Sequence, residues 1–357
     1  MDTLKLTLIS ISVLTLCSCQ LGYLTKSAYN QLSLLNQRVP IEDALNDPGV
    51  TNEEKAKLKL SQDVRLFSEN TLKLNVKKNY STFVKLDRPY VSYVVSASPK
   101  WTLETHYWNF PIVGKVPYKG YFSEADAKDE GESLKAENYD VYIRGVSAYS
   151  TLGWFKDPLL SSMLRYKDHD LVNTIIHESV HATLFIKSEA DFNERLATFL
   201  GNKGMEIYYQ QKEGNDSETL KKAKNENADE KRFSTFITAE IKDLEKWYEN
   251  QKEQKEDLRR ARLNEIKTNF IEKVKPFLLT ENYQKFDSID LNNARIIVYK
   301  TYLQDMSDLE DLYQLNDNNF VKFFETVKRL EKQDKPSLRV KDLIAEMSAA
   351  KINKGTQ

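Results

Sequence analysis

The feature that most constrains this chain is the pentapeptide His177-Glu178-Ser179-Val180-His181, which lies in a largely apolar segment without proline or glycine, residues 171–186. Side chains four residues apart lie on one face of an α-helix, so both imidazoles can reach the same metal ion. Glu178 is rotated by about 100° from His177, because a helix turns once in about 3.6 residues. Its carboxylate is therefore expected beside the ion, where it can accept a proton from metal-bound water. The alternative is an amphipathic helix with two surface histidines and a solvated glutamate.

A third metal ligand is expected downstream of the pentapeptide. Glu194 lies 13 residues after His181, in a second segment with helical apolar spacing at residues 192–209, which follows a turn at 187–191. Two antiparallel helices would present Glu194 across from the histidines. Two His, one Glu and a water make a tetrahedral catalytic site with one open position, so the sequence predicts one Zn²⁺ ion. Taken alone, Glu194 also fits a solvated glutamate at a helix start, where the helix dipole favours it.

The N-terminal residues resemble a bacterial lipoprotein signal. The apolar run at residues 6–16 follows Lys5 and is too short to span a bilayer as a helix. The sequence Leu16-Cys17-Ser18-Cys19 resembles a lipobox, which predicts a signal peptide at residues 1–18 and a lipid on Cys19. No acidic residue directly follows Cys19. In this the sequence resembles lipoproteins that are sorted to the outer membrane, so we expect the protein there, facing the periplasm. An ordinary signal peptide or an uncleaved anchor is the alternative.

The composition narrows the partners that the chain is expected to have. Cys17 and Cys19 are its only cysteines, so the mature protein is expected to have neither a disulfide nor a thiolate zinc site. Fifty-two basic residues nearly balance 53 acidic ones, which gives no reason to expect a nucleic-acid partner. The expected partners are a peptide substrate and the membrane, through the lipid on Cys19, and the sequence identifies no protein partner.

The spacing of apolar residues predicts an α+β fold that is predominantly helical, with the two zinc helices at its centre. We interpret residues 19–330 as one metallopeptidase unit, followed by a C-terminal tail at 331–357. Along this unit we expect a helical segment at 19–80 and a β-containing segment at 81–150. The zinc-site helices follow at 160–211, and a second helical segment is expected at 233–330.

Shorter patterns refine this outline. Segments rich in β-branched and aromatic residues predict strands at 90–97 and 139–146. The polar residues 212–232 are interpreted as a loop or a solvated helix end. The apolar stripe that follows them predicts a long helix or a helical hairpin that ends at Pro276.

The residues around the pentapeptide resemble a bacterial family of predicted aminopeptidases, which are zinc metallopeptidases of the glutamate-zincin type. Besides the metal motif, the resemblance rests on further segments, and together they cover most of residues 19–330. These segments are Phe110-Pro111-Ile112-Val113-Gly114, Val116-Pro117-Tyr118-Lys119-Gly120-Tyr121-Phe122, Ala148-Tyr149-Ser150-Thr151-Leu152-Gly153-Trp154-Phe155, Asp157-Pro158-Leu159-Leu160 and Asn292-Asn293-Ala294-Arg295. The resemblance implies a zinc-dependent peptidase with His177, His181 and Glu194 as ligands.

The developing oxyanion needs a donor besides the metal. The resemblance favours Tyr149, which lies in the distinctive segment just before the metal helix, as this catalytic residue. Tyr118, His169 and Arg195 are the other candidates, and each tyrosine also fits ordinary packing.

Two residues near Glu194 have open roles. Better-known glutamate zincins often carry an aspartate four residues after the ligating glutamate, and Thr198 occupies that position here. Its hydroxyl either bonds a ligand more weakly or packs within the helix. Asn193 either holds the substrate backbone or caps the second helix.

The expected reaction is peptide hydrolysis, most simply aminopeptidase action, in which zinc-bound water activated by Glu178 attacks the scissile carbonyl. The alternative from another class is a non-catalytic, lipid-anchored envelope protein. In that case the metal site is structural or vestigial, and the charged helices at 212–275 bind a partner. A third hypothesis is hydrolysis of a non-peptide amide, such as a cell-wall fragment.

Overall fold

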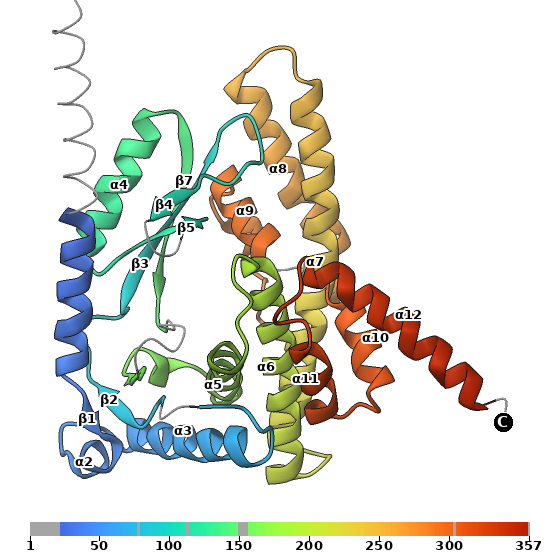
Figure 1. Ribbon diagram of the computed structural model, residues 1–357. Helices are drawn as coiled ribbons and strands as arrows, with labels where there is room; N and C mark the ends of the chain where they lie inside the picture. The colour runs from blue at the N-terminus through green and yellow to red at the C-terminus, as the bar shows by residue number, and fades with distance from the viewer. Residues whose placement is uncertain (1–21, 77–78, 111–113, 149–155, 303–304, 356–357) are drawn as a thin grey trace, which may run out of the picture.

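The computed structural model describes residues 22–76, 79–110, 114–148, 156–302 and 305–355. These residues form an α+β fold in which helices predominate and the strands belong to small sheets, as the sequence predicts. Two helices that follow each other along the chain, α5 (Asp168–Thr183) and α6 (Ala190–Glu213), lie near the middle of the molecule (Figure 1).

The N-terminal part is helical, as expected. Residues 22–36 form a helix, which β1 (Val39–Pro40) connects to α2 (Ile41–Asn46) and α3 (Asn52–Asn70). A capping box starts α3, because the Glu54 N–H donates to the Thr51 hydroxyl and the Thr51 N–H donates to the Glu54 carboxylate. Helix α3 then packs against α5.

The largest antiparallel sheet has the order β6-β3-β7. Its strands are β3 (Ser92–Pro99), β6 (Lys119–Tyr121) and β7 (Tyr139–Val146), so both predicted strands are present. Helix α4 (Glu124–Ala136) packs on this sheet through Ala127 and Leu134. Helix α4 is not among the predicted elements, because most of its residues are charged or small and few apolar side chains mark a helical stripe.

Two smaller sheets complete the β structure. Strand β2 (Thr82–Val84) pairs antiparallel with β1 and parallel with β8 (Leu159–Leu160). Strand β4 (Trp108–Phe110) pairs with β5 (Gly114–Val116). The parallel pairing of β2 with β8 brings the chain before β2 next to the chain before β8, where the Tyr80 N–H donates to the Asp157 carbonyl.

The polar residues 212–232 are mostly helical. Helix α7 (Glu218–Asn250) begins within them and forms a hairpin with α8 (Glu256–Lys273). This confirms the hairpin among the predicted alternatives, and Pro276 lies in the short 3-10 helix η2 (Lys275–Phe277) directly after α8. The hairpin and helix α9 (Asn293–Tyr302) enclose a second hydrophobic core, rich in aromatic side chains.

The C-terminal part contains more separate helices than the sequence analysis outlined. Helices α9, α10 (Ser307–Leu315) and α11 (Phe320–Lys328) follow the hairpin within the helical part predicted at 233–330. The predicted tail is largely helix α12 (Pro336–Gly355), which extends away from the rest of the molecule (Figure 1). Within the described residues, none of the helices combines the length and the apolar character needed to cross a membrane.

Candidate metal centre

Helix α5 carries both histidines of the pentapeptide beside its buried face. Five aliphatic side chains that are at most 1% exposed form this face: Leu171, Val172, Ile175, Ile176 and Val180. The helix ends at Thr183, three residues before the predicted end, and Leu184 is extended. Leu184 and Ile186 are buried whereas Phe185 is exposed. This alternation belongs to an extended chain, so the apolar residues after Thr183 pack well without helical structure.

The face of α6 that meets α5 is built from small residues. Ala197, Gly201 and Gly204 follow Glu194 at intervals of three, seven and ten residues, which places all four on one side of the helix. A methyl group added at Gly201 would lie 2.9 Å from Asn173 Oδ1, and one at Gly204 would lie 2.9 Å from Ile176 Cγ2. The two helices therefore approach closely, and Glu194, near the start of α6, reaches α5.

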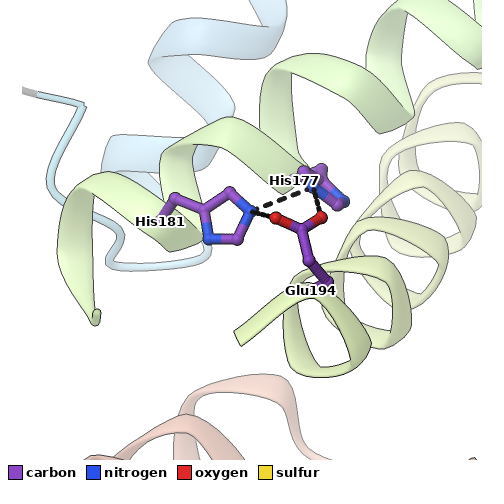
Figure 2. A group of neighbouring side chains, drawn as sticks. All are labelled: His177, His181 and Glu194. Atoms are coloured by element: carbon purple, nitrogen blue, oxygen red, sulfur yellow. Dashed lines mark hydrogen bonds and ion pairs between the residues drawn. The ribbon is translucent and has the colours of Figure 1, made fainter. Parts of the chain in front are cut away.

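The side chains of His177, His181 and Glu194 converge from these two helices (Figure 2). Nε2 of His177 lies 3.1 Å from Nε2 of His181. The Glu194 carboxylate oxygens lie 3.6 Å from Nε2 of His177 and 3.5 Å from Nε2 of His181. Ligand atoms bound to a tetrahedral zinc ion at about 2.1 Å are about 3.4 Å apart. The two imidazole nitrogens and the carboxylate oxygen nearest to each of them are close to this spacing, and one ligand atom from each residue lies within 4.8 Å of the other two, so the group could hold a metal ion.

The charges in this group favour a cation. Burial alone would raise the pKa of Glu194, but its bonds to His177 and His181 outweigh burial, so this pKa lies well below the ordinary value. Burial would lower the pKa of His181, but the hydrogen bond to Glu194 and the charge of Glu178 raise it overall. The Glu194 carboxylate thus favours positive charge beside it, on the His181 imidazole or on a metal cation.

Glu178 lies beside this group rather than within it, as its rotation along the helix predicts. Its Oε2 atom is shielded from solvent and has no hydrogen-bond partner. Burial raises the pKa of Glu178, His177 and His181 lower it, and the negative charge of Glu194 raises it again, with a net upward shift. A shielded, unpartnered carboxylate next to a cation site is suited to take up and release a proton.

Whether a metal ion fits here depends on the donor atoms of the three side chains and on the hydrogen bonds around them. His181 is 5% exposed, and its Nδ1 atom has no hydrogen-bond partner. Among the described residues, no hydrogen bond joins Thr198 to either histidine. With two imidazoles and one carboxylate as donors, the set matches a catalytic zinc site. The site therefore fits zinc, although its outer hydrogen bonds are sparse.

Two tyrosines that the sequence analysis did not single out lie near Glu178. Burial raises the pKa values of Tyr80 and Tyr166, and the charge of Glu178 raises them further. Tyr80 is 2% exposed and has φ 57°, a left-handed conformation that costs a non-glycine residue about 1–2 kcal/mol. Its N–H donates to the Asp157 carbonyl at 2.7 Å, and its own carbonyl accepts from Gln62 Nε2 at 2.7 Å. These long-range contacts have no signature in local sequence.

The four candidates for the oxyanion donor differ in their position and in the partners that they bind. Tyr149 lies outside the described residues, so its role stays a prediction. The side chain of Tyr118 is 40% exposed. The Arg195 guanidinium binds Asp308 at 2.8 Å, and His169 belongs to a separate cluster described next.

A second group of possible ligands lies at the start of α5. His169 Nε2 lies 2.7 Å from Glu226 Oε2 and 3.6 Å from Asp170 Oδ1. The other oxygen of Glu226 already binds the Lys167 ammonium at 2.7 Å. Since Lys167 supplies the positive charge, this cluster is an ion-pair link between α5 and α7 and competes poorly for a metal.

A model of the family described as "Putative aminopeptidase" matches residues 22–343 of the chain. No curated protein and no solved structure matches this chain. The matched span includes α5, α6 and all three residues of the candidate metal centre.

Proposed function

The chain belongs to the "Putative aminopeptidase" family, and on that premise we propose that it is a zinc-dependent peptide hydrolase of the glutamate-zincin type, acting as an aminopeptidase. The observation that carries this proposal is the convergence of His177, His181 and Glu194 at ligand spacing. The shielded carboxylate of Glu178 beside them supplies the second element that hydrolysis requires.

Each residue of the centre has a distinct part in the proposed reaction. His177, His181 and Glu194 would hold one zinc ion, which when bound acts as a Lewis acid that lowers the pKa of water and polarises a carbonyl. Glu178 accepts the proton of the attacking water and passes it to the leaving amine. A second donor stabilises the oxyanion, and Tyr149 remains the residue proposed for it.

The number of protein ligands favours a catalytic metal site over a purely structural one. Structural zinc sites are closed by four protein ligands, whereas catalytic sites have three and leave one position open. Among the described residues, the group contains three such side chains. A non-catalytic envelope protein and a hydrolase of non-peptide amides are the competing functions.

We also propose that the protein acts at the bacterial envelope, anchored by a lipid on Cys19 after removal of residues 1–18. This rests on the lipobox-like sequence Leu16-Cys17-Ser18-Cys19. By the same reasoning the anchor is in the outer membrane, with the catalytic unit facing the periplasm.

The function can be tested with the purified chain and three classes of substrate. Zinc content is measured first, and then hydrolysis of aminoacyl amides, of the same compounds with an acetylated N-terminus, and of longer peptides. We expect about one zinc per chain, activity that a chelator removes and zinc restores, and a preference for free N-termini. Cleavage of acetylated peptides at equal rates would argue for an endopeptidase. A chain that binds zinc but hydrolyses neither peptides nor cell-wall amides would favour the non-catalytic function.

A further inference from the structure

The side chain of Asn193 joins the loop after the metal helix to the start of α6. Its Oδ1 atom accepts a hydrogen bond from the Ile186 N–H at 3.0 Å, and its Nδ2 atom donates to the Ile186 carbonyl at 2.7 Å. Asn193 is 2% exposed and Ile186 is 4% exposed. Both polar groups of one backbone residue are thus satisfied by one side-chain amide, away from solvent.

This contact excludes both roles that the sequence suggested for Asn193. The N-cap residue of α6 is Glu189, and Asn193 lies in the first turn of the helix itself. Its amide is buried and already engaged on both atoms, so it is not available to a substrate backbone.

The start of α6 has no side-chain cap, and the hydrogen bonds between Asn193 and Ile186 hold it to the preceding loop. Glu189 makes no capping hydrogen bond, and the first N–H groups of a helix lack partners within the helix. Ser188, just before it, has φ 65°, in the left-handed region. An uncapped first turn after a strained loop would be prone to fraying, and Glu194 is the next residue after Asn193.

Glu194 has a second anchored neighbour on its other side. The Arg195 guanidinium binds the Asp308 carboxylate at 2.8 Å and the Asp305 carbonyl at 3.2 Å. Residues 193 and 195 are therefore both attached to other parts of the fold, one to the loop after α5 and the other to α10. Glu194 lies between these two attachments, which restrain the movement of its backbone.

We propose that Asn193 is a positioning residue for the metal centre, whose two hydrogen bonds to Ile186 set the place of the Glu194 carboxylate opposite His177 and His181. The inference rests on the proposed function, because it assigns to Asn193 the geometry of a zinc ligand. A ligand displaced by about an ångström loses metal affinity even when the fold remains intact.

The test compares Asn193→Ala with Asn316→Ala. Asn316 is a matched control because it is also a buried asparagine whose amide makes two hydrogen bonds, to Leu312 and Thr326, but it lies in the C-terminal helices. Zinc affinity is measured by competition with a chromophoric chelator, and the unfolding of the metal-free chain is measured in urea. We expect both variants to lose stability, and Asn193→Ala alone to bind zinc about 10–100-fold more weakly.

A second variant and a second readout cover a failure of Asn193→Ala to fold. Asn193→Gln retains the amide and adds one methylene group, so it cannot make both hydrogen bonds without moving the helix. Its Co²⁺-substituted form should show an absorption spectrum that differs from that of the wild type, because the ligand geometry has changed. If the Asn193 variants bind zinc as tightly as the wild type and show an unchanged Co²⁺ spectrum, the positioning role of Asn193 is overturned. The proposed function is not affected by that result. A wild-type chain that binds no zinc would overturn the proposed function as well.

Discussion

Nε2 of His177 lies 3.1 Å from Nε2 of His181, a separation at which one ring can donate a hydrogen bond to the other. Two zinc ligands in tetrahedral geometry are only slightly farther apart, at about 3.4 Å. The separation of the two nitrogens therefore suits two ligands of one zinc ion.

Replacing Glu194 by Gln removes the only negative charge among the three proposed ligands. We expect zinc affinity to fall by more than about a hundredfold, beyond the 10–100-fold loss typical of residues that only support a ligand. Chelator competition measures this. Asp191→Asn is the control, because it removes an exposed charge from the same first turn of α6 and should leave affinity unchanged. Equal affinities in the two variants would remove Glu194 from the ligand set.

Glu178→Gln should retain zinc and lose turnover. The amide keeps the shape of the carboxylate but accepts no proton at neutral pH, so kcat should fall by about 10²–10⁴-fold. Metal content and single-substrate kinetics on the same preparation separate the two effects. Substantial hydrolysis by a zinc-loaded Glu178→Gln chain would contradict the role of general base.

The oxyanion donor can be identified with two tyrosine variants. If Tyr149 donates to the oxyanion, Tyr149→Phe should lower kcat by about 10²–10³-fold with little change in KM. Tyr166→Phe is the comparison, because Tyr166 lies near Glu178 and its hydroxyl has a pKa raised mainly by burial. A loss of kcat confined to Tyr166→Phe would transfer the role to that residue.

Gly204→Ala should destabilise the protein and weaken metal binding together. The added methyl group would lie 2.9 Å from Ile176 Cγ2 and 3.0 Å from Leu72 Cδ1, so these side chains must shift or α6 must move away from α5. Such overpacking costs about 1–3 kcal/mol, measurable by urea unfolding. Gly120→Ala is the control, since no atom lies within 4 Å of its added methyl group. An unaffected zinc affinity in a destabilised Gly204→Ala chain would show that the helix contact does not set the ligand geometry.

Glu226 should make stability depend on pH through its link to Lys167 and His169. Burial would raise the pKa of Glu226, but its bonds to Lys167 and His169 lower it below the ordinary value of 4.5. A carboxyl group with a depressed folded-state pKa stabilises the fold above its unfolded pKa, and this contribution is lost as the pH falls through the folded value. Glu226→Gln should therefore reduce the free energy of unfolding by about 1–3 kcal/mol near neutral pH.

The same comparison at low pH supplies the control. Once the pH has fallen below 4.5 and through the depressed pKa of Glu226, the wild-type carboxyl group is protonated, so the difference between wild type and Glu226→Gln should shrink. Urea unfolding at both pH values measures it. A difference that is independent of pH would contradict the ion-pair link.

Much of the fold could be predicted because it follows local patterns. The spacing of apolar residues predicted α5 and α6, and the β-branched and aromatic runs predicted β3 and β7. Helix α4 was missed, and α12 was described only as a tail. Both have weak apolar stripes, so their helical structure depends on packing against neighbouring elements and is not marked by spacing alone.

The sequence by itself determined which side chains could form the metal centre, because helical spacing alone places His177 and His181 on one face and puts Glu194 in the next helix. The tertiary structure alone decided how Glu194 reaches them, through the close approach at Gly201 and Gly204 and the attachment of Asn193 to Ile186. It also placed Tyr80 and Asp157 near Glu178. The physical reason is that periodicity reports which face of an element is apolar, whereas the distance and rotation between two elements depend on contacts between residues far apart in the chain.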